Sequence, residues 1–329
     1  MTEYGRNRYL PEGMLIGSGE NRAFTTTRSG LERASAQGTI LEGMAVMCDH
    51  DMNISVDLGG EIKGRIAHEE IAYSLDNSPV KDIAVITRVG RAVCFKVIGF
   101  ETNSHGEVVA ILSRKQAQIE CMRNYLMQLI PGDIIDAKIT HMEQFGAFLD
   151  VGCGIISLMP IDCISVSRIA HPRDRFYVGE RIRAIVRSID YTSGKIYLSH
   201  KEMLGTWAEN AEMFSVGQTV AGIVRSIEEY GIFVELTPNL AGLAELRDDI
   251  TVGQTAAVYI KNIIPDRMKI KLVLIDAYKG ELSPNQNHYF VSPKETHIDY
   301  WRYSPRGCSK IIETNFMEIV PEIDAVHIT

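Results

Sequence analysis

Five short runs of strand-like sequence follow one another within about seventy residues, between Gly132 and Lys201. In the first run, residues 134–139, apolar and polar side chains nearly alternate, as is typical of a half-buried strand. Turn residues separate the runs, and the longest irregular segment lies between the third and the fourth. So many short strands in one stretch predict a small closed five-stranded barrel of the OB type.

Two aromatic residues, Phe145 and Phe148, lie at the centre of this stretch with Gly146 and Ala147 between them. In a strictly alternating strand, residues three apart point to opposite faces. Glycine in a strand often marks a bulge, so we expect a bulge at this pair that brings both rings to one outer surface. Exposed rings stack on unpaired bases, worth about 1–3 kcal/mol per base. The alternative, in which one or both rings belong to the core, stays open.

Three motifs in the stretch carry a family resemblance: Phe-Gly-Ala-Phe-Leu-Asp-Val-Gly at 145–152, Gly-Glu-x-Ile-x-Ala-x-Val at 179–186 and Gly-Lys-Ile-x-Leu-Ser at 194–199. A second, shorter match follows at 217–224 and 230–236. Together they resemble the tandem RNA-binding repeats of the ribosomal protein S1 family, in a short form with about three repeats. The resemblance implies a single-stranded RNA-binding protein of the translation apparatus.

The resemblance also implies which side chains of the central repeat contact RNA. Phe145 and Phe148 match the two stacking rings, while Asp190 and Lys195 match an acidic and basic pair around the turn into the last strand. Pro160 stands where the family usually has histidine, which removes a hydrogen-bond donor and a stacking ring.

Basic residues in the long connection of the central repeat are further candidates, because arginine suits both phosphate contacts and stacking on bases. The alternative is an ordinary solvated face with Asp174 and Glu180 as acidic partners. The candidates are Arg168, His171, Arg173 and Arg175.

The third repeat keeps an aromatic pair, Tyr230 and Phe233, and the resemblance gives Lys269 the role of its basic residue. Its histidine position is Glu245, which repels phosphate, and the connection at 247–252 is short. We therefore expect weaker RNA binding here than in the central repeat.

Residues 39–115 resemble a worn first copy of the repeat, in which 56–60 (Val-Asp-Leu-Gly-Gly) parallels the turn of the central repeat. The positions of the stacking rings become Met52 and Ser55, so no aromatic side chain stands there. We expect this copy to keep the barrel, with strands that include 83–86, and to serve as a structural or protein-docking module.

The prediction for the whole chain is a mainly β protein of tandem five-stranded OB-type barrels joined by short helical linkers. A continuous run of good helix formers at 114–129 predicts the longest linker. An aromatic hairpin is expected from the segments 288–291 and 297–303. The predicted units are a flexible N-terminal tail with a short helix (1–37), a degenerate barrel (38–115), a helical linker (116–130), the RNA-binding barrel (131–202), a second linker (203–214), a shortened barrel (215–278) and an aromatic C-terminal extension (279–329).

Composition limits the function classes. The net charge of −8 argues against indiscriminate nucleic-acid binding and favours a focused basic surface. The 6 cysteines have no Cys-x-x-Cys spacing, which excludes common zinc motifs and indicates a reducing cytosol. No phosphate loop, nucleophile elbow or membrane-length apolar run occurs, so we expect neither an enzyme nor a membrane protein, and no catalytic residue, metal, cofactor or small-molecule substrate.

The partners that the resemblance implies are single-stranded RNA, specifically mRNA, and the small ribosomal subunit. The alternative is a non-enzymatic, ribosome-associated adaptor whose barrels bind protein without contacting RNA. The substitutions in the first copy and at Pro160 and Glu245 favour this alternative.

Overall fold

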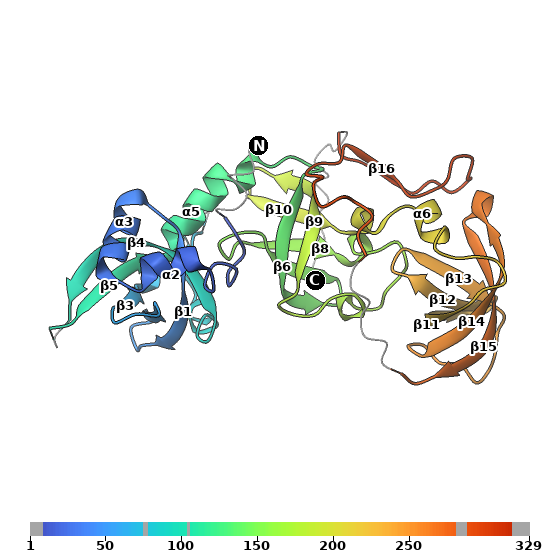
Figure 1. Cartoon of the computed structure of the whole chain (residues 1–329), viewed down its shortest axis with the longest axis horizontal. Helices are drawn as coiled ribbons and strands as arrows, with labels where there is room; N and C mark the ends of the chain where they lie inside the picture. Colours follow the sequence, from blue (N-terminus) through green and yellow to red (C-terminus); the bar gives the residue numbers. More distant parts are fainter. Residues whose placement is uncertain (1–8, 75–77, 104–105, 281–287, 318–329) are drawn as a thin grey trace.

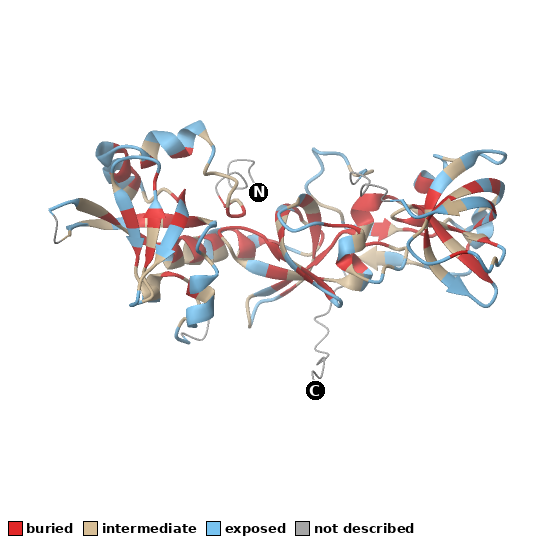
Figure 2. Ribbon diagram, turned by 90° about the horizontal axis from the view of Figure 1, so that it is seen from below, coloured by how far each residue is buried: buried red, intermediate tan, exposed pale blue. Residues whose placement is uncertain are grey.

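The computed structural model describes residues 9–74, 78–103, 106–280 and 288–317. The chain is mainly β and contains three closed five-stranded barrels that follow one another along its long axis (Figure 1). Each barrel has its own buried core, and buried residues occur along the whole molecule in Figure 2. The predicted fold class of tandem OB-type barrels is confirmed.

Barrel 1 is closed by antiparallel pairing of β1 with β4 and by parallel pairing of β3 with β5. Its strands are β1 (Leu41–Cys48), β2 (Ile54–Asp57), β3 (Lys63–Ile66), β4 (Ala92–Thr102) and β5 (Val108–Ser113). The expected strand at 83–86 is wrong, because Asp82–Ile86 forms the short helix α4 and buries only Val85. One apolar side chain inside and polar or exposed neighbours outside suit a helical turn on the barrel surface.

Barrel 2 has the same topology, with parallel pairing of β8 and β10 beside four antiparallel pairs. Its strands are β6 (Ile134–Glu143), β7 (Gly146–Asp150), β8 (Ile156–Pro160), β9 (Arg181–Asp190) and β10 (Lys195–Ser199). Side chains from alternate positions fill its core, as the period of two in the sequence predicts.

Barrel 3 repeats the arrangement with longer strands and a short connection between β13 and β14. Its strands are β11 (Thr219–Glu228), β12 (Gly231–Thr237), β13 (Leu240–Ala244), β14 (Thr255–Ile264) and β15 (Lys269–Tyr278). The helix α6 (Trp207–Ala211) precedes it, and Trp207 is buried in the core of this barrel.

The N-terminal segment is not a flexible tail over residues 9–37, and that expectation is wrong; residues 1–8 lie outside the described part of the chain. Two helices, α2 (Gly19–Thr25) and α3 (Arg28–Gln37), pack on barrel 1 and bury Leu31 and Ala34 in its core. Thr27 caps α3, and Gly38 ends it in the left-handed conformation that glycine adopts readily.

A buried charge cluster joins the N-terminal segment to barrels 1 and 2. The Nε of Arg114 donates to Glu12 at 2.6 Å, and the backbone N–H of Glu12 donates to Asp150 at 2.8 Å. Arg114 also donates to the carbonyl of Gly154 in barrel 2 at 3.3 Å. Burial and the neighbouring charge of Glu12 raise the pKa of Asp150 to about 7.

The linker helix α5 (Arg114–Asn124) leads from barrel 1 to barrel 2, as Figure 1 shows. It is shorter than the run 114–129, because the turn at Tyr125 leads into a 3₁₀ helix at Leu126–Gln128. Its buried residues include Arg114, Ala117 and Cys121, so the helix is packed between the two barrels and is not a free spacer.

The C-terminal extension packs along barrels 2 and 3 (Figure 1). Its two short strands are β16 (Tyr300–Arg302) and β17 (Glu313–Asn315), so the expected hairpin between 288–291 and 297–303 is wrong. The backbone of Ile298 donates to Gly132 of barrel 2 at 2.9 Å, while Trp301 and Tyr303 are buried with the core of barrel 3. Apolar rings and backbone hydrogen bonds therefore hold it against both barrels.

Candidate nucleic-acid interface

The β6–β7 hairpin brings Phe145 and Phe148 together. Phe145 lies in the turn just before β7 and is 57% exposed, and its ring meets that of Phe148 edge to face with centroids 5.9 Å apart. The bulge expected at Gly146 and Ala147 is wrong. The register shift lies instead in β6, between Ile139 and His141.

Gly146 does not form a bulge; it allows two strands to lie close together. A Cβ atom there would lie 2.5 Å from the carbonyl oxygen of Met159, so glycine allows β7 and β8 to approach closely. The two rings share a surface because one lies in the hairpin turn and the other on the strand.

A row of side chains crosses the outer wall of barrel 2 at the level of Phe148. Strand register places His141 opposite Phe148, Phe148 opposite Leu158, and Leu158 beside Tyr197. None of these four residues is buried, although their neighbours in the strands largely are. We call this set of four residues on β6, β7, β8 and β10 the platform row.

His141 and Tyr197 were not among the sequence candidates. The His141 ring stacks on Phe148 with centroids 6.0 Å apart and an interplanar angle of 29°. It also makes a hydrogen bond of 2.5 Å to Glu143. His141 supplies an aromatic neighbour on one side of Phe148, where the sequence pointed only to the ring lost at Pro160. The signal that finds it is the cross-strand register, which the bulge in β6 hides from a reading of the sequence.

Lys195 and Asp190 lie opposite each other in the strand register of the β9–β10 hairpin. Lys195 is exposed and lies two residues before Tyr197, on the same face of β10 as the platform row. Hydrogen bonds from the side chain and backbone of Ser193 and the backbone of Thr192 lower the pKa of Asp190. The carboxylate therefore orders the turn that carries the lysine.

Barrel 3 has an equivalent row with different chemistry. Register places Ser226 opposite Phe233, Phe233 opposite Leu243, and Leu243 beside Lys271. Tyr230 is 69% exposed and meets Phe233 edge to face at 6.0 Å. The row thus keeps one ring, Phe233, and has Ser226 where barrel 2 has His141. It ends in Lys271, which lies on the same face of β15 as Lys269.

In barrel 1 the equivalent row is Met47, Ser55, Arg65 and Ile111. It contains no aromatic side chain, and Met52 in the turn occupies the place of Phe145. The register thus places no aromatic side chain in this row, in agreement with the alignment of the repeats in the sequence.

The connection between β8 and β9 holds the remaining candidates, and they fall into different environments. Arg175 is 5% exposed and forms a buried ion pair with Glu235 of barrel 3, so it is unavailable to RNA and its assignment was wrong. The ring of His171 accepts the backbone N–H of Arg173 at 3.1 Å and caps a short 3₁₀ helix, Pro172–Asp174. Arg168 and Arg173 are exposed.

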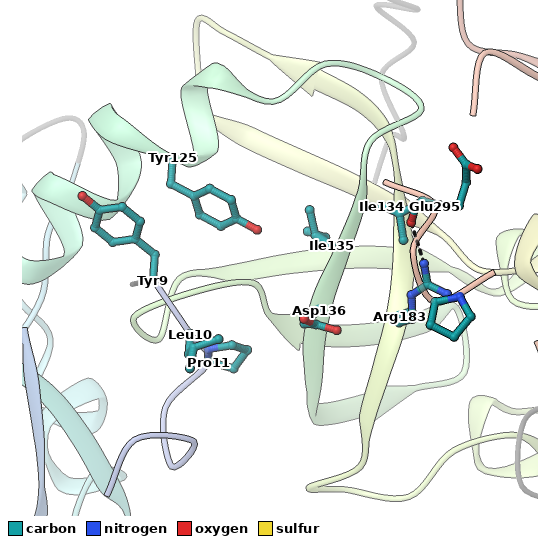
Figure 3. A pocket seen from close by; sticks show the side chains of 10 residues that line it. Tyr9, Leu10, Pro11, Tyr125, Ile134, Ile135, Asp136, Arg183 and Glu295 are labelled. Carbon is teal, nitrogen blue, oxygen red and sulfur yellow. Dashed lines mark hydrogen bonds between the residues drawn. The ribbon is translucent and has the colours of Figure 1, made fainter. Parts of the chain in front are cut away.

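A cleft of about 160 Å³ lies on another wall of barrel 2, where the N-terminal segment and the C-terminal extension approach β6 and β9 (Figure 3). Arg183 at its edge donates to the carbonyl oxygens of Glu295 at 2.7 Å and Val291 at 3.2 Å. The side chain of Arg183 at this cleft therefore binds the C-terminal extension.

No group of three or more His, Cys, Asp or Glu side chains in the described part of the chain is arranged to hold a metal ion. Among the helices there, none is both long and apolar enough to cross a bilayer.

Parts of the chain are similar in sequence to known proteins. Residues 128–201 match the family described as the S1 RNA binding domain. Small ribosomal subunit protein bS1 of Staphylococcus aureus (strain COL) is 28% identical over 171 residues, which cover 51% of this chain and 43% of that protein. The bS1 homolog of Bacillus subtilis (strain 168) is 27% identical over 203 residues, which cover 60% of this chain and 51% of that protein. The chain thus spans about half the length of the curated relatives that it matches.

Among solved structures, a multidomain protein with nucleic acid binding domains from Streptococcus pneumoniae aligns with a TM-score of 0.24 and 13% identity, over 72% of this chain and 73% of that chain. The matched residues 128–201 contain all five strands of barrel 2 and the whole platform row. Barrel 2 therefore matches the S1 RNA binding domain along its whole length, and about half of the chain is similar to bacterial small ribosomal subunit protein bS1.

Proposed function

We propose that this chain binds unstructured single-stranded RNA, with mRNA as its ligand in translation, and catalyses no reaction. In this proposal it works in the cytoplasm and associates with the small ribosomal subunit. Two findings support it: the match of barrel 2 to the S1 RNA binding domain and the sequence similarity to bS1 proteins.

The observation that carries the proposal is the open aromatic surface of barrel 2. Phe145 and His141 are exposed, Phe148 and Tyr197 are partly exposed, and Lys195 adds a positive charge on the same wall. Stacking uses the π-face that every base has, so binding through this surface tolerates many sequences. The lysine meets a phosphate as a point charge.

The test is a fluorescence-anisotropy titration of a labelled, unstructured RNA of about a dozen nucleotides at two salt concentrations. Phe148→Ala should weaken binding by about 1–3 kcal/mol, the value of one stacked base. Lys195→Ala should reduce the slope of log affinity against log salt by about one.

Tyr278→Ala is the matched control, because Tyr278 is a 52% exposed aromatic residue at the far end of β15, outside both rows. Its affinity should equal that of the wild type. Absence of wild-type binding at low salt would disprove the proposal, and equal losses in Phe148→Ala and Tyr278→Ala would show that the platform row is not the RNA site.

The alternative, a ribosome-associated adaptor, is favoured by one observation on barrel 1. That barrel lacks rings in its row and exposes large apolar side chains on β1 and α4, including Met47 at 55% and Ile83 at 63%. Co-sedimentation with purified small ribosomal subunits separates the two functions. Association that survives Phe148→Ala combined with Phe233→Ala, while free RNA binding is lost, would favour the adaptor.

A further inference from the structure

The aromatic pair of barrel 3 has acidic surroundings. Tyr230 follows Glu228 and Glu229 in the β11–β12 hairpin, and all three residues are exposed, as is Glu245 after β13. The short connection of this barrel contains one arginine, Arg247, which is paired with Asp249 at 2.5 Å. The two exposed lysines of this wall, Lys269 and Lys271, lie on β15 at the other end of the row. A phosphate on the β11–β12 side of the rings therefore needs a cation from elsewhere.

The connection of barrel 2 crosses the outer wall of barrel 3 at β11, β12 and the β12–β13 turn. At one end, the backbone N–H of Val166 donates to the side-chain oxygen of Asn239 at 2.9 Å. At the other end, Arg175 pairs with Glu235, and Asp174 pairs with Arg225 at 3.2 Å. Both ends of the segment 166–175 are thus fixed to barrel 3, and its two exposed arginines lie between the anchors.

One end of this segment lies close to the stacking surface of barrel 3. Glu235 is two residues after Phe233 on β12, so both side chains point outward on the same face, about 7 Å apart along the strand. Arg173 is two residues before Arg175, the anchor at Glu235. Arg168 is nearer to the other anchor, at Asn239, which is farther along the chain from Phe233.

Arg173 is also held in place by its neighbours. The ring of His171 and the carboxylate of Asp174 complete a capping box around the 3₁₀ helix that contains Arg173. Among the residues that the structure describes, no hydrogen bond or ion pair engages its guanidinium. A fixed backbone with a free, exposed guanidinium suits a phosphate contact.

From this arrangement we propose that barrels 2 and 3 form one composite RNA site, in which Tyr230 and Phe233 stack on bases and Arg173 of barrel 2 contacts a phosphate of the same nucleotides. The inference rests on the proposed RNA binding and deepens it. The connection of barrel 2 replaces the one that barrel 3 has shortened, so barrel 3 binds RNA more strongly in the intact chain than its own side chains allow.

A double-mutant cycle in the full-length chain tests this, with the same labelled RNA. In the Phe148→Ala background, where barrel 3 carries more of the binding, Arg173→Ala should weaken affinity about 5- to 10-fold near 0.1 M salt. This is the effect of one lost counterion release, since affinity varies with about the −0.9 power of salt per phosphate contact. In the Phe233→Ala background the same change should cost less than about twofold, because the phosphate is no longer placed beside the arginine.

Arg168→Ala is the charge-matched control on the same segment and should show the same small effect in both backgrounds. Equal effects of Arg173→Ala in the two backgrounds, or coupling of Arg173 to Phe148 in place of Phe233, would overturn the composite site while leaving the RNA-binding proposal intact. Absence of wild-type binding would instead overturn the proposed function itself. Unchanged thermal unfolding of Arg173→Ala confirms that the variant is folded, as an exposed residue predicts.

Discussion

The guanidinium of Arg175 in barrel 2 donates to both carboxylate oxygens of Glu235 in barrel 3, at 2.5 and 3.0 Å. Both residues are buried, and Arg225 of barrel 3 donates to the same carboxylate at 2.9 and 3.1 Å. Two cations therefore depend on one acidic side chain at the junction of the barrels. Asp174 supplies a second anion to Arg225.

Glu235→Ala should destabilise barrel 3 by about 3–5 kcal/mol, because it leaves two arginines close together with most of their compensating charge removed. Urea unfolding followed by tryptophan fluorescence measures this, since both tryptophans of the chain, Trp207 and Trp301, are buried in the core of barrel 3. Asp249→Ala, which breaks an exposed pair with Arg247, is the control and should have a much smaller effect. Comparable losses in the two variants would contradict the role of the buried cluster.

His141→Ala should weaken RNA binding by about 1 kcal/mol, because it removes a ring stacked on Phe148. Glu143→Gln is its control: this change removes the carboxylate that bonds His141 but keeps the ring, and affinity should not fall. In barrel 3, Ser226→His places a ring at the equivalent position and should strengthen binding. An affinity of His141→Ala equal to that of the wild type would mean that RNA does not reach β6.

The barrels themselves could be predicted from the sequence because their information is local. Alternating apolar residues specify each strand, and glycine turns specify where strands end, as in the run from 134 to 199. The meeting of Phe145 and Phe148 was also predictable in outcome. Its cause was not, because the sequence alone does not show that β7 begins at Gly146 and leaves Phe145 in the hairpin turn. The position of the bulge in β6 depends on how two strands pair and leaves no mark on either strand alone.

Long-range contacts could not be predicted in the same way. Glu12 and Arg114 are 102 residues apart, and Arg175 and Glu235 are 60 apart. A charged residue in a polar segment has the same local appearance whether it is solvated or buried against another module. Arg175 was therefore indistinguishable from Arg173 in the sequence, although one is buried in an ion pair and the other is exposed.

The buried carboxyl group of Asp150 should make stability depend on pH. Its pKa is raised to about 7, mainly by burial and by Glu12, from an unfolded value of about 3.9. A raised carboxyl pKa gives a stabilising contribution that is fully present below the unfolded pKa and is lost as pH rises through the folded pKa. The free energy of unfolding should therefore fall between about pH 4 and pH 7.

Denaturant unfolding across this range measures the effect. Asp150→Asn should flatten the fall, whereas Asp57→Asn, at the equivalent but exposed position of barrel 1, should leave it unchanged. Glu12 acts in the opposite direction. Burial raises the pKa of Glu12, but the charge and hydrogen bonds of Arg114 lower it by more, so the pKa lies below its usual value. The contribution of Glu12 to stability is therefore lost only as pH falls below the usual glutamate range. A slope that Asp150→Asn leaves intact would assign the pH dependence to other groups.

His297 should make the attachment of the C-terminal extension sensitive to pH in the neutral range. Its Nδ1 bonds to Asp133 of barrel 2 at 2.8 Å and its Nε2 to Asp299 at 3.0 Å, so the doubly protonated ring satisfies two carboxylates. Although partial burial lowers the pKa of His297, these hydrogen bonds and charges raise it above its usual value. The stabilising contribution is therefore fully present below the unfolded pKa of about 6.5 and is lost as pH rises through the higher folded pKa.

Limited proteolysis of the extension measures this loss when His297→Gln and the wild type are compared at each pH, so that the pH dependence of the protease cancels. The variant should be cut faster than the wild type at pH 6, and the ratio of the two rates should approach one as pH rises past the folded pKa. His288→Gln, which changes an exposed histidine of the same extension, should give a ratio near one throughout. A ratio for His297→Gln that stays constant or grows with pH would show that the protonated ring does not hold the extension. The attachment to barrel 2 would then rest on other contacts, among them the backbone bonds of Ile134 and Ile298 and the side chain of Arg183.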